Sequence, residues 1–314
     1  MKKPIILFVI ITTLIISILP YKNYAQIKSM SMLEYSYKVK HIQLSDEINI
    51  AYADEGEGVE TIIFIHGLGS YIPAWKRNIK ELSKKYRCIA LDLPGYGKSS
   101  KNPHNGMMTF YAKVVSEFMD KLNLKSAVIA GHSMGGQIAM VMAISYPQKV
   151  KKLILVDPAG FELFNPGQKS WLENIFTPNL VKSTSVEAIE TNLAVNFYNM
   201  PDEALFMIKD RIDMRSADDF YNYCYTVSKS VSGMIEEPVF DKLSLIIQPT
   251  LIMFGENDNL IPNRYLNPGR TVKIAENGAN SIKNSKLVMV PKCGHFMMFE
   301  KPEVFNKEVA DFLN

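Results

Sequence analysis

The stretch Val128-Ile-Ala-Gly-His-Ser-Met-Gly-Gly136 decides how this chain is expected to fold. The apolar run from Ser126 to Ala130 predicts a short strand, and apolar residues at helical spacing from Met134 to Tyr146 predict a helix. Between them lies Gly131-x-Ser133-x-Gly135. A strand that turns into a helix within a few residues crowds the side chain at the corner, and glycines leave room for it. The pattern therefore predicts a strained, exposed serine at the positive N-terminal end of a helix.

The segments on either side alternate between apolar strands and helical patterns, which indicates parallel βαβ units. Strands are expected at 61–65, 86–91, 126–130, 152–156, 249–254 and 286–290, and helices at 74–85, 109–122, 134–146 and 302–313. The first of these strands, Thr61 to Ile65, is apolar throughout, which is typical of a strand buried on both faces. Segments 37–44 and 47–54 are expected to form an antiparallel hairpin at one edge of the sheet.

The alternation of strands and helices stops between about residues 160 and 243. No buried strand is apparent there, and the helical patterns carry many aromatic residues and methionines. This predicts a helical cap inserted between two parts of the core, 26–159 and 244–314. The apolar side chains of the cap could line an apolar substrate pocket, pack as a small core of their own, or do both. Segment 263–286 is expected to be a loop with a short helix that could border the pocket.

Composition excludes several classes of function. The chain has 314 residues, 47% of them hydrophobic, which suits one large domain with an insertion. A net charge of +3 without a basic stripe argues against a nucleic-acid partner. Three widely spaced cysteines indicate no disulfide framework, and no histidine pair has metal-ligand spacing. Gly97-Lys98-Ser99 lacks the earlier glycine of a phosphate loop, so no nucleotide cofactor is expected.

The N-terminus has the pattern of a targeting segment. Met1-Lys-Lys is followed by an apolar run from Ile5 to Leu19, which is too short to span a bilayer comfortably. Cleavage after Ala25 would give an exported protein, periplasmic or secreted, although Asn23 is larger than such a cleavage site prefers. The alternative is an uncleaved membrane anchor. In both cases residues 1–25 are expected to lie outside the fold.

Three residue types that serve nucleophilic catalysis follow predicted strands. A serine needs a base to take its proton, and that base needs a carboxylate to orient it. Ser133, Asp258 and His295 all lie in loops after strands, and the ends of parallel strands converge on one edge of a sheet. Their order along the chain is nucleophile, acid, histidine. Asp157 also ends a strand and is the alternative acid.

From residue 37 to its end the chain resembles the α/β-hydrolase superfamily. The resemblance is carried by His66-Gly67, Asp92-x-Pro94-Gly95-x-Gly97-x-Ser99, Gly131-His-Ser-Met-Gly135, Gly255-x-x-Asp258 and Gly294-His295. It implies an α/β fold in which a mostly parallel sheet is flanked by helices and carries an inserted helical cap.

The resemblance also implies a role for each site residue, and it implies no cofactor or metal. Ser133 would attack the substrate, His295 would take its proton, and Asp258 would hold the imidazole. The backbone N–H groups of Leu68 and Met134 would bind the developing oxyanion. His66 would shape the oxyanion loop, and His132 would occupy a variable position.

The preferred hypothesis is a serine hydrolase that cleaves small carboxylic esters through an acyl-enzyme, and the apolar cap favours medium or lipid-like acyl groups. One alternative is a carbon–carbon bond hydrolase of the meta-cleavage type or a cofactor-free perhydrolase. Meta-cleavage enzymes usually resemble Gly-Asn-Ser-Met-Gly-Gly here, whereas this chain has His132. Ser133 in place of a carboxylate argues against dehalogenase or epoxide hydrolase activity. A non-catalytic binding protein on the same fold is the third hypothesis.

Overall fold

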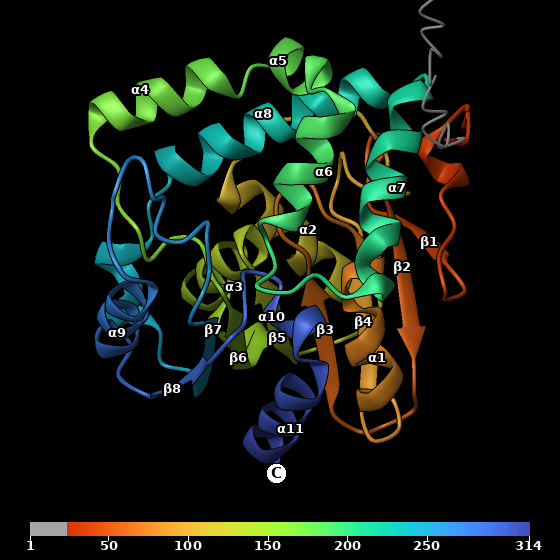
Figure 1. Cartoon of the computed structure of the whole chain (residues 1–314). Coiled ribbons are helices and arrows are strands. Elements are labelled where there is room, and N and C mark those ends of the chain that lie inside the picture. The colour runs from red at the N-terminus through yellow and green to blue at the C-terminus, as the bar shows by residue number, and fades with distance from the viewer. Residues whose placement is uncertain (1–23) are drawn as a thin grey trace, which may run out of the picture.

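An eight-stranded sheet runs through residues 24–314, the part of the chain that the computed structural model describes (Figure 1). Its strands are β1 (Lys40–Gln43), β2 (Asn49–Glu55), β3 (Thr61–Ile65), β4 (Arg87–Leu91), β5 (Ala127–His132), β6 (Val150–Val156), β7 (Thr250–Gly255) and β8 (Ser285–Val290). The strand order is β1-β2-β4-β3-β5-β6-β7-β8. The pairs β1–β2 and β2–β4 are antiparallel, and all the others are parallel.

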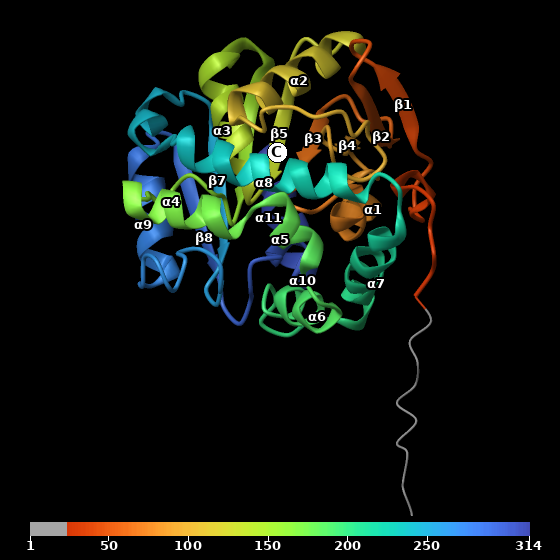
Figure 2. The same ribbon diagram turned by 90° about the horizontal axis from the view of Figure 1, so that it is seen from above.

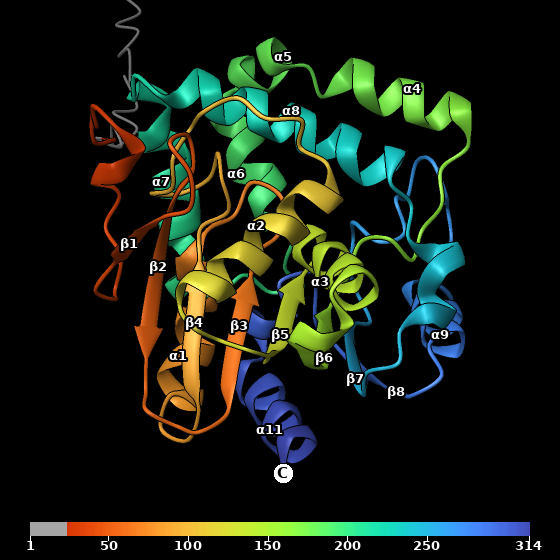
Figure 3. The ribbon, with the colours of Figure 1, turned by 180° about the vertical axis from the view of Figure 1, so that it is seen from behind.

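Helices cover both faces of this sheet (Figures 1 and 3). They are α1 (Lys76–Leu82), α2 (Met108–Lys121), α3 (Met134–Ser145), α9 (Thr271–Ser281), α10 (Met297–Glu300) and α11 (Pro302–Leu313). Alternate residues of β3 point to opposite faces: Ile63 and Ile65 pack in the core beside α2, α3 and α9, whereas Ile62 and Phe64 pack beside α1, α10 and α11. Burial on both faces explains why this strand is apolar throughout.

Five further helices lie between β6 and β7, over the carboxyl ends of the parallel strands (Figures 1 and 2). These cap helices are α4 (Pro166–Ile175), α5 (Pro178–Ser183), α6 (Val186–Ala194), α7 (Leu205–Asp213) and α8 (Phe220–Glu236). Local sequence starts three of them, because the side chains of Asn165, Thr177 and Ser185 accept backbone N–H groups in the first turns of α4, α5 and α6. The helix α8 packs against α4 and α5 and joins them to the core at α2.

The first described residues contact the cap before the chain reaches β1. The N–H of Ala25 donates to Asp213 Oδ1 at 2.8 Å, and the N–H of Ile27 donates to Ser216 Oγ at 2.9 Å. The N–H of Met30, a fully buried residue, donates to an Asp219 carboxylate oxygen at 3.0 Å. The predicted targeting segment, by contrast, lies outside the described residues apart from 24 and 25. None of the helices formed by residues 24–314 is long and apolar enough to cross a membrane.

The predicted α/β-hydrolase fold is confirmed, and most predicted elements fall within a few residues of their observed bounds. The strand at 61–65 and the helix at 302–313 match at both ends. The predicted helix at 74–85 is shorter, because residues Ile72–Trp75 form a tighter 3₁₀ turn with Pro73 near its start. The short helix expected within 263–286 is α9, whose eleven residues pack against β7 and β8.

Candidate active site

Ser133 lies at the corner between β5 and α3, where the sequence predicts a strained turn. Its backbone has φ 53° and ψ −119°, a left-handed conformation that side chains with a Cβ atom rarely adopt. A Cβ atom on Gly131 would lie 2.2 Å from the carbonyl oxygen of Gly135, and one on Gly135 would lie 2.3 Å from the carbonyl oxygen of Ile65. Both glycines are therefore needed for α3 to start so close to β3 and β5.

Backbone hydrogen bonds hold this corner in place. The N–H of Ser133 donates to the carbonyl of Val156 at 3.0 Å, and the carbonyl of Ser133 accepts the N–H groups of Gly136 and Ala159 at 2.8 and 3.0 Å. These bonds tie the turn to the end of β6. The side chain is left free to face a cavity that Ser133 lines together with His295.

His295 and Asp258 form a buried acid–base pair. The Nδ1 atom of His295 lies 2.8 Å from Oδ2 of Asp258, and both side chains are almost fully inaccessible. The other oxygen of Asp258 accepts the N–H groups of Leu260 and Ile261 at 2.7 and 3.1 Å. Because Asp258 holds Nδ1, Nε2 is the nitrogen that could accept a proton from a nucleophile.

The serine and this pair come together without a hydrogen bond between them. Among the described residues, Ser133 Oγ forms no hydrogen bond with His295, although both line one cavity. Such a contact is often long in an empty enzyme and shortens when substrate binds. The arrangement thus has the parts of a nucleophile, a base and an orienting acid, drawn from the ends of β5, β8 and β7.

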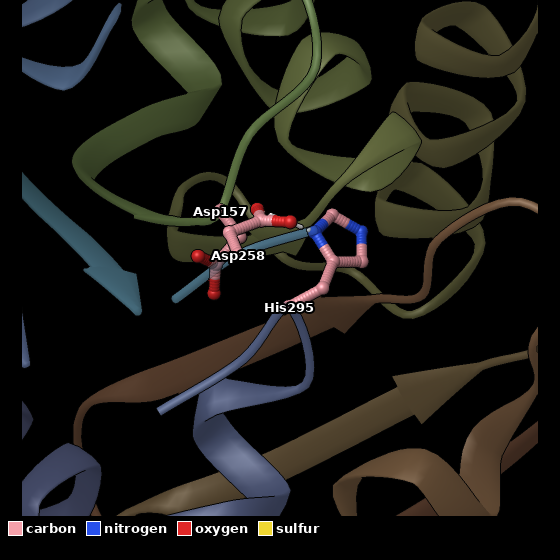
Figure 4. Close-up of side chains that lie close together, drawn as sticks. All are labelled: Asp157, Asp258 and His295. Atoms are coloured by element: carbon pink, nitrogen blue, oxygen red, sulfur yellow. Dashed lines mark hydrogen bonds and ion pairs between the residues drawn. The ribbon is translucent and has the colours of Figure 1, made fainter. Parts of the chain in front are cut away.

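Asp157, the alternative acid, lies beside the same pair. It follows β6, is fully buried, and accepts the N–H of Gly255 at 2.8 Å through Oδ1. Oxygen atoms of Asp157 and Asp258 and a ring nitrogen of His295 all lie within 4.8 Å of one another (Figure 4). These are also ligand types for a divalent cation. However, His295 Nδ1 and Asp258 Oδ2 already bond to each other, so the group fits a proton network better than a metal site.

Hydrogen bonds of His66 hold the loop after β3, which is the segment predicted to form the oxyanion loop. The Nε2 atom of His66 accepts the N–H of Leu93 at 3.0 Å, so its Nδ1 atom donates to the carbonyl of Gly67 at 2.8 Å. Burial lowers the pKa of His66, which keeps this ring neutral. Leu68 lines the cavity, and Met134 is the first residue of α3, whose first N–H groups have no partner within the helix.

His132 makes a contact that sequence reasoning did not anticipate. Its Nε2 atom donates to the backbone carbonyl of His295 at 2.9 Å, and the two rings lie 4.8 Å apart. Burial, together with the neighbouring His295, lowers the pKa of His132 well below its ordinary value. This neutral ring therefore supports the loop that carries His295. No local sequence signal distinguishes this contact, because it depends on how the ends of β5 and β8 meet.

The cavity above Ser133 has a volume of about 350 Å³ and a mostly apolar wall. The cap contributes Leu172, Val231 and Ile235, which are buried against one another. A second cavity of about 380 Å³ lies alongside and shares Leu68 and three other lining residues with the first. Both readings of the apolar cap therefore hold at once, since the small core of the cap also forms the wall of the cavity.

An arginine on α7 lines the second cavity. Arg211 donates to the carbonyl of Gly69, next to the predicted oxyanion residue Leu68, and its guanidinium lies 5.3 Å from the ring centre of Tyr223. Its Nε atom is buried without a hydrogen-bond partner, and none of the ion pairs recorded for residues 24–314 involves Arg211. Arg211 as a whole is half-buried, and a cation partly withdrawn from water usually has a carboxylate partner.

The cap is fastened to the loop that carries His295 through one carboxylate. Glu300, the last residue of α10, accepts the N–H of Gly294 at 2.8 Å. It also accepts the N–H groups of Tyr198 and Asn199, in the connection between α6 and α7, at 3.1 and 2.7 Å. The position of the cap and the position of the histidine are thereby linked.

Comparison with known proteins agrees with this geometry. Residues 60–302 match the family model of the alpha/beta hydrolase fold. The chain is 30% identical to a Pseudomonas putida protein named 2-hydroxy-6-oxononadienedioate/2-hydroxy-6-oxononatrienedioate hydrolase 1, over 87% of this chain and 96% of that protein.

Two solved structures are similar to this one. The first is of a "probable hydrolytic enzyme" from Pseudomonas aeruginosa, with a TM-score of 0.83 and 24% identity over 92% of this chain and 99% of that one. The second is of a membrane phospholipase A described as a bacterial virulence factor. It has a TM-score of 0.72 and 27% identity over 88% of this chain and 85% of that one.

Proposed function

Because the chain belongs to the alpha/beta hydrolase fold family and is a hydrolase, we propose that it cleaves carboxylic esters with medium or long acyl chains through an acyl-enzyme intermediate. The observation that carries the proposal is the apolar cavity above Ser133, into which His295 also faces. A largely apolar cavity of about 350 Å³ suits an acyl chain better than a charged or strongly hydrated group.

The mechanism assigns each residue one task. Ser133 Oγ attacks the ester carbonyl while His295 Nε2 takes its proton, and Asp258 stabilises the imidazolium that forms. The N–H groups of Leu68 and Met134 bind the oxyanion, each contributing about 3–4 kcal/mol to the transition state. His295 then returns the proton to the leaving alcohol. Water repeats the sequence on the acyl-enzyme and releases the acid.

Hydrolysis of p-nitrophenyl esters of increasing acyl length tests this proposal. We expect activity that disappears in Ser133→Ala, with an optimum at medium length. In Met234→Ala, which removes a half-buried side chain from the cavity wall, the optimum should move to longer chains. The matched control is Met32→Ala, an exposed methionine outside this cavity. Activity that survives Ser133→Ala would refute the mechanism.

A carbon–carbon bond hydrolase acting on a carboxylate substrate is the second candidate, and Arg211 favours it. A guanidinium with an unsatisfied buried Nε would gain from pairing with a substrate carboxylate. The P. putida relative is named for a dioate, a substrate class that carries such groups. The second cavity, which Arg211 lines, lies next to the first, and Leu68 lines both. A substrate could thus place an anionic end near Arg211 while its reacting carbon approaches Ser133.

The two candidates can be separated with one further variant. A 2-hydroxy-6-oxodienoate loses its absorbance when its carbon–carbon bond is cleaved. If this is the substrate class, Arg211→Met should lower kcat/KM for it by about 10–100-fold, the worth of a charge-assisted hydrogen bond. Hydrolysis of p-nitrophenyl butyrate should change by less than about threefold in the same variant. Arg211→Lys keeps the positive charge but lacks the planar guanidinium that can donate two hydrogen bonds to one carboxylate. Its kcat/KM for the dienoate should therefore lie between those of the wild type and Arg211→Met. No cleavage of the dienoate by the wild type would leave the ester proposal alone.

The N-terminal segment would bring this hydrolase to the cell envelope, either as a cleaved export signal or as an anchor. The pattern of Met1-Lys-Lys and the apolar run supports this, as does the likeness to a membrane phospholipase A. Fractionation of cells that express the whole chain tests it. Recovery in the soluble cytoplasmic fraction at full length would contradict both forms, and mass spectrometry of the N-terminus distinguishes cleavage from anchoring.

A further inference from the structure

Two buried carboxyl groups stand at the ends of neighbouring strands, and the ester mechanism uses only one of them. Asp157 follows β6 and Asp258 follows β7, and these strands are paired in parallel. Figure 4 shows the Asp258 carboxyl against the His295 ring and the Asp157 carboxyl next to that of Asp258, and one ligand-type atom of each residue lies within 4.8 Å of the others. The function of Asp157 in this cluster is unexplained by the triad.

The hydrogen bonds of Asp258 are those of an ionised carboxylate. It accepts three N–H donors, namely the Nδ1–H of His295 and the backbone N–H groups of Leu260 and Ile261. Such donors stabilise a negative charge in a buried position. Asp258 can therefore remain charged while it orients the imidazole.

Asp157 has a different environment. Its Oδ1 atom accepts the N–H of Gly255 and the backbone of Met297 also faces the carboxyl group, whereas its Oδ2 atom is buried without a hydrogen-bond partner among the described residues. An ionised Asp157 would place a second negative charge next to Asp258 with one oxygen left unsatisfied. Burial and then the charge of Asp258 raise the pKa of Asp157 well above its ordinary value. A proton on Oδ2 removes both problems, because the resulting O–H becomes a donor toward Asp258.

The titratable groups that face Asp157 agree with this assignment. Asp258 comes from the loop after β7, and His295 and Cys293 come from the loop after β8. Burial raises the pKa of the Cys293 thiol, so it stays neutral. Farther out, Glu162 lies near Asp258, and the neutral ring of His132 packs against His295. No cation among these groups would hold Asp157 in its charged form.

The backbone around Asp157 fixes its side chain relative to Asp258. Its φ of 41° is left-handed, a conformation that aspartate tolerates better than most residues. Its N–H donates to the carbonyl of Met253 at 2.8 Å, and its Oδ1 atom accepts from Gly255. Both partners belong to β7, the strand that carries Asp258 just beyond its end, so both carboxyls are anchored to the same strand.

We propose that Asp157 is a positioning residue that carries the one proton of the Asp157–Asp258 pair and donates it as a hydrogen bond to Asp258. The inference rests on the proposed serine hydrolase mechanism. During the reaction the proton of Ser133 moves to His295 and on to the leaving group, while the proton of Asp157 stays in place. Asp258 keeps its charge throughout and is held against Nδ1 of His295.

Three variants test this assignment through the rate at which a fluorophosphonate labels Ser133, measured against pH. Asp157→Asn preserves an acceptor for Gly255 and a donor for Asp258, so labelling should stay within about threefold of the wild type with an unchanged pH midpoint. Asp157→Leu removes both, so the rate should fall by at least about tenfold. In Asp157→Leu the acidic limb of the curve of labelling rate against pH should also move to higher pH. The reason is that Asp258, once it lacks the hydrogen bond from Asp157, stabilises the imidazolium of His295 more strongly. Asp258→Asn should lose about 10³–10⁴-fold.

Infrared spectroscopy gives a second measurement that does not depend on activity or on how well Asp157→Leu folds. The wild type at pH 7 should show the carbonyl band of a protonated carboxyl group, and this band should be absent in Asp157→Asn. Two results would overturn the proposal: labelling of Ser133 in Asp157→Asn that is as slow as in Asp258→Asn, or a wild-type spectrum without the band. Failure of the probe to label the wild type would instead refute the serine hydrolase mechanism, so the two failures are distinguishable.

Discussion

The central strands of the sheet and the outer cap helices, α4 to α6, are built in opposite ways. Every residue of β3, β5 and β7 is buried, whereas α4 and α6 each bury one side chain, Leu172 and Ile189, and α5 buries none. Large apolar side chains of the cap, such as Trp171 and Leu180, remain exposed. The outer cap helices α4 to α6 have so few buried contacts that they can rearrange at low cost, whereas the close-packed sheet and α8, which buries nine residues, cannot.

This difference separates chemistry from substrate choice. The side chains that would react, Ser133, Asp258 and His295, all come from the carboxyl ends of sheet strands. The cap supplies one wall of the cavity and Arg211, which would select the substrate. The two layers meet at Glu300, whose carboxylate binds backbone from both. If this division is right, substitutions in the sheet should abolish activity and those in the cap should redirect it.

The largest expected effect is that of Ser133→Ala on turnover. Loss of the nucleophile should lower kcat by about 10⁶-fold, since the remaining groups act only together with it. Met234→Ala in the cap wall should change kcat/KM for a preferred ester by less than about tenfold. Steady-state assays on the same ester measure both variants. A cap variant that is as inactive as the serine variant would break the proposed division.

A pair of glycine substitutions sharpens the comparison in terms of stability. In Gly135→Ala the new Cβ would lie 2.3 Å from the carbonyl oxygen of Ile65, so β3 and α3 must move apart, at a cost of about 3 kcal/mol. In Gly167→Ala on α4 the new atom would meet only Asn165 Oδ1 at 3.4 Å, so the helix should gain about 0.5–1 kcal/mol. Urea unfolding measures both. Equal destabilisation would show that the cap is packed as tightly as the sheet.

The glycines also show what could be predicted from the sequence. The turn at Ser133 was predictable because its requirements are local: a strand, a helix and residues without Cβ atoms between them. The order of strands and helices likewise followed from periodicity within short windows. For the same reason the strand at 61–65 was predicted with both ends correct.

Contacts between distant segments were not predictable in this way. The sequence indicated that Asp157 and Asp258 both end strands, but not that these strands are neighbours with the carboxyls beside one ring. The bond from His132 to the carbonyl of His295 and the placement of Arg211 beside Gly69 join residues far apart in the chain. Such contacts are set by how layers dock, for which a single sequence carries no periodic signal.

An intermediate effect is expected where the two layers join. Glu300→Ala would leave the N–H groups of Gly294, Tyr198 and Asn199 without their acceptor, which should cost about 2–3 kcal/mol of stability. Because Gly294 precedes His295, kcat/KM should also fall by about tenfold. The control is Glu303→Ala, an exposed residue in the first turn of α11, which should change neither quantity measurably. Loss of stability without loss of activity would show that the cap does not position the histidine.

The last effect expected is a dependence of stability on pH that belongs to the sheet and not to the cap, and over a single pH unit it is smaller than the effect of Glu300→Ala. Burial and the charge of Asp258 raise the pKa of Asp157, so the folded protein keeps a proton that the unfolded chain releases above about pH 4. This contribution to stability is complete below that pH and is lost as pH rises toward the folded-state pKa. Relative to Asp157→Asn, the wild type should therefore lose about 1.4 kcal/mol per pH unit over this range. The matched cap variant is Glu173→Gln, at an exposed position on α4. Its free energy of unfolding should change with pH in the same way as that of the wild type. Urea unfolding between pH 4 and 8 measures the free energy of unfolding of the wild type and of both variants. If that of Asp157→Asn followed the same pH dependence as the wild type, Asp157 would be ionised in the folded protein.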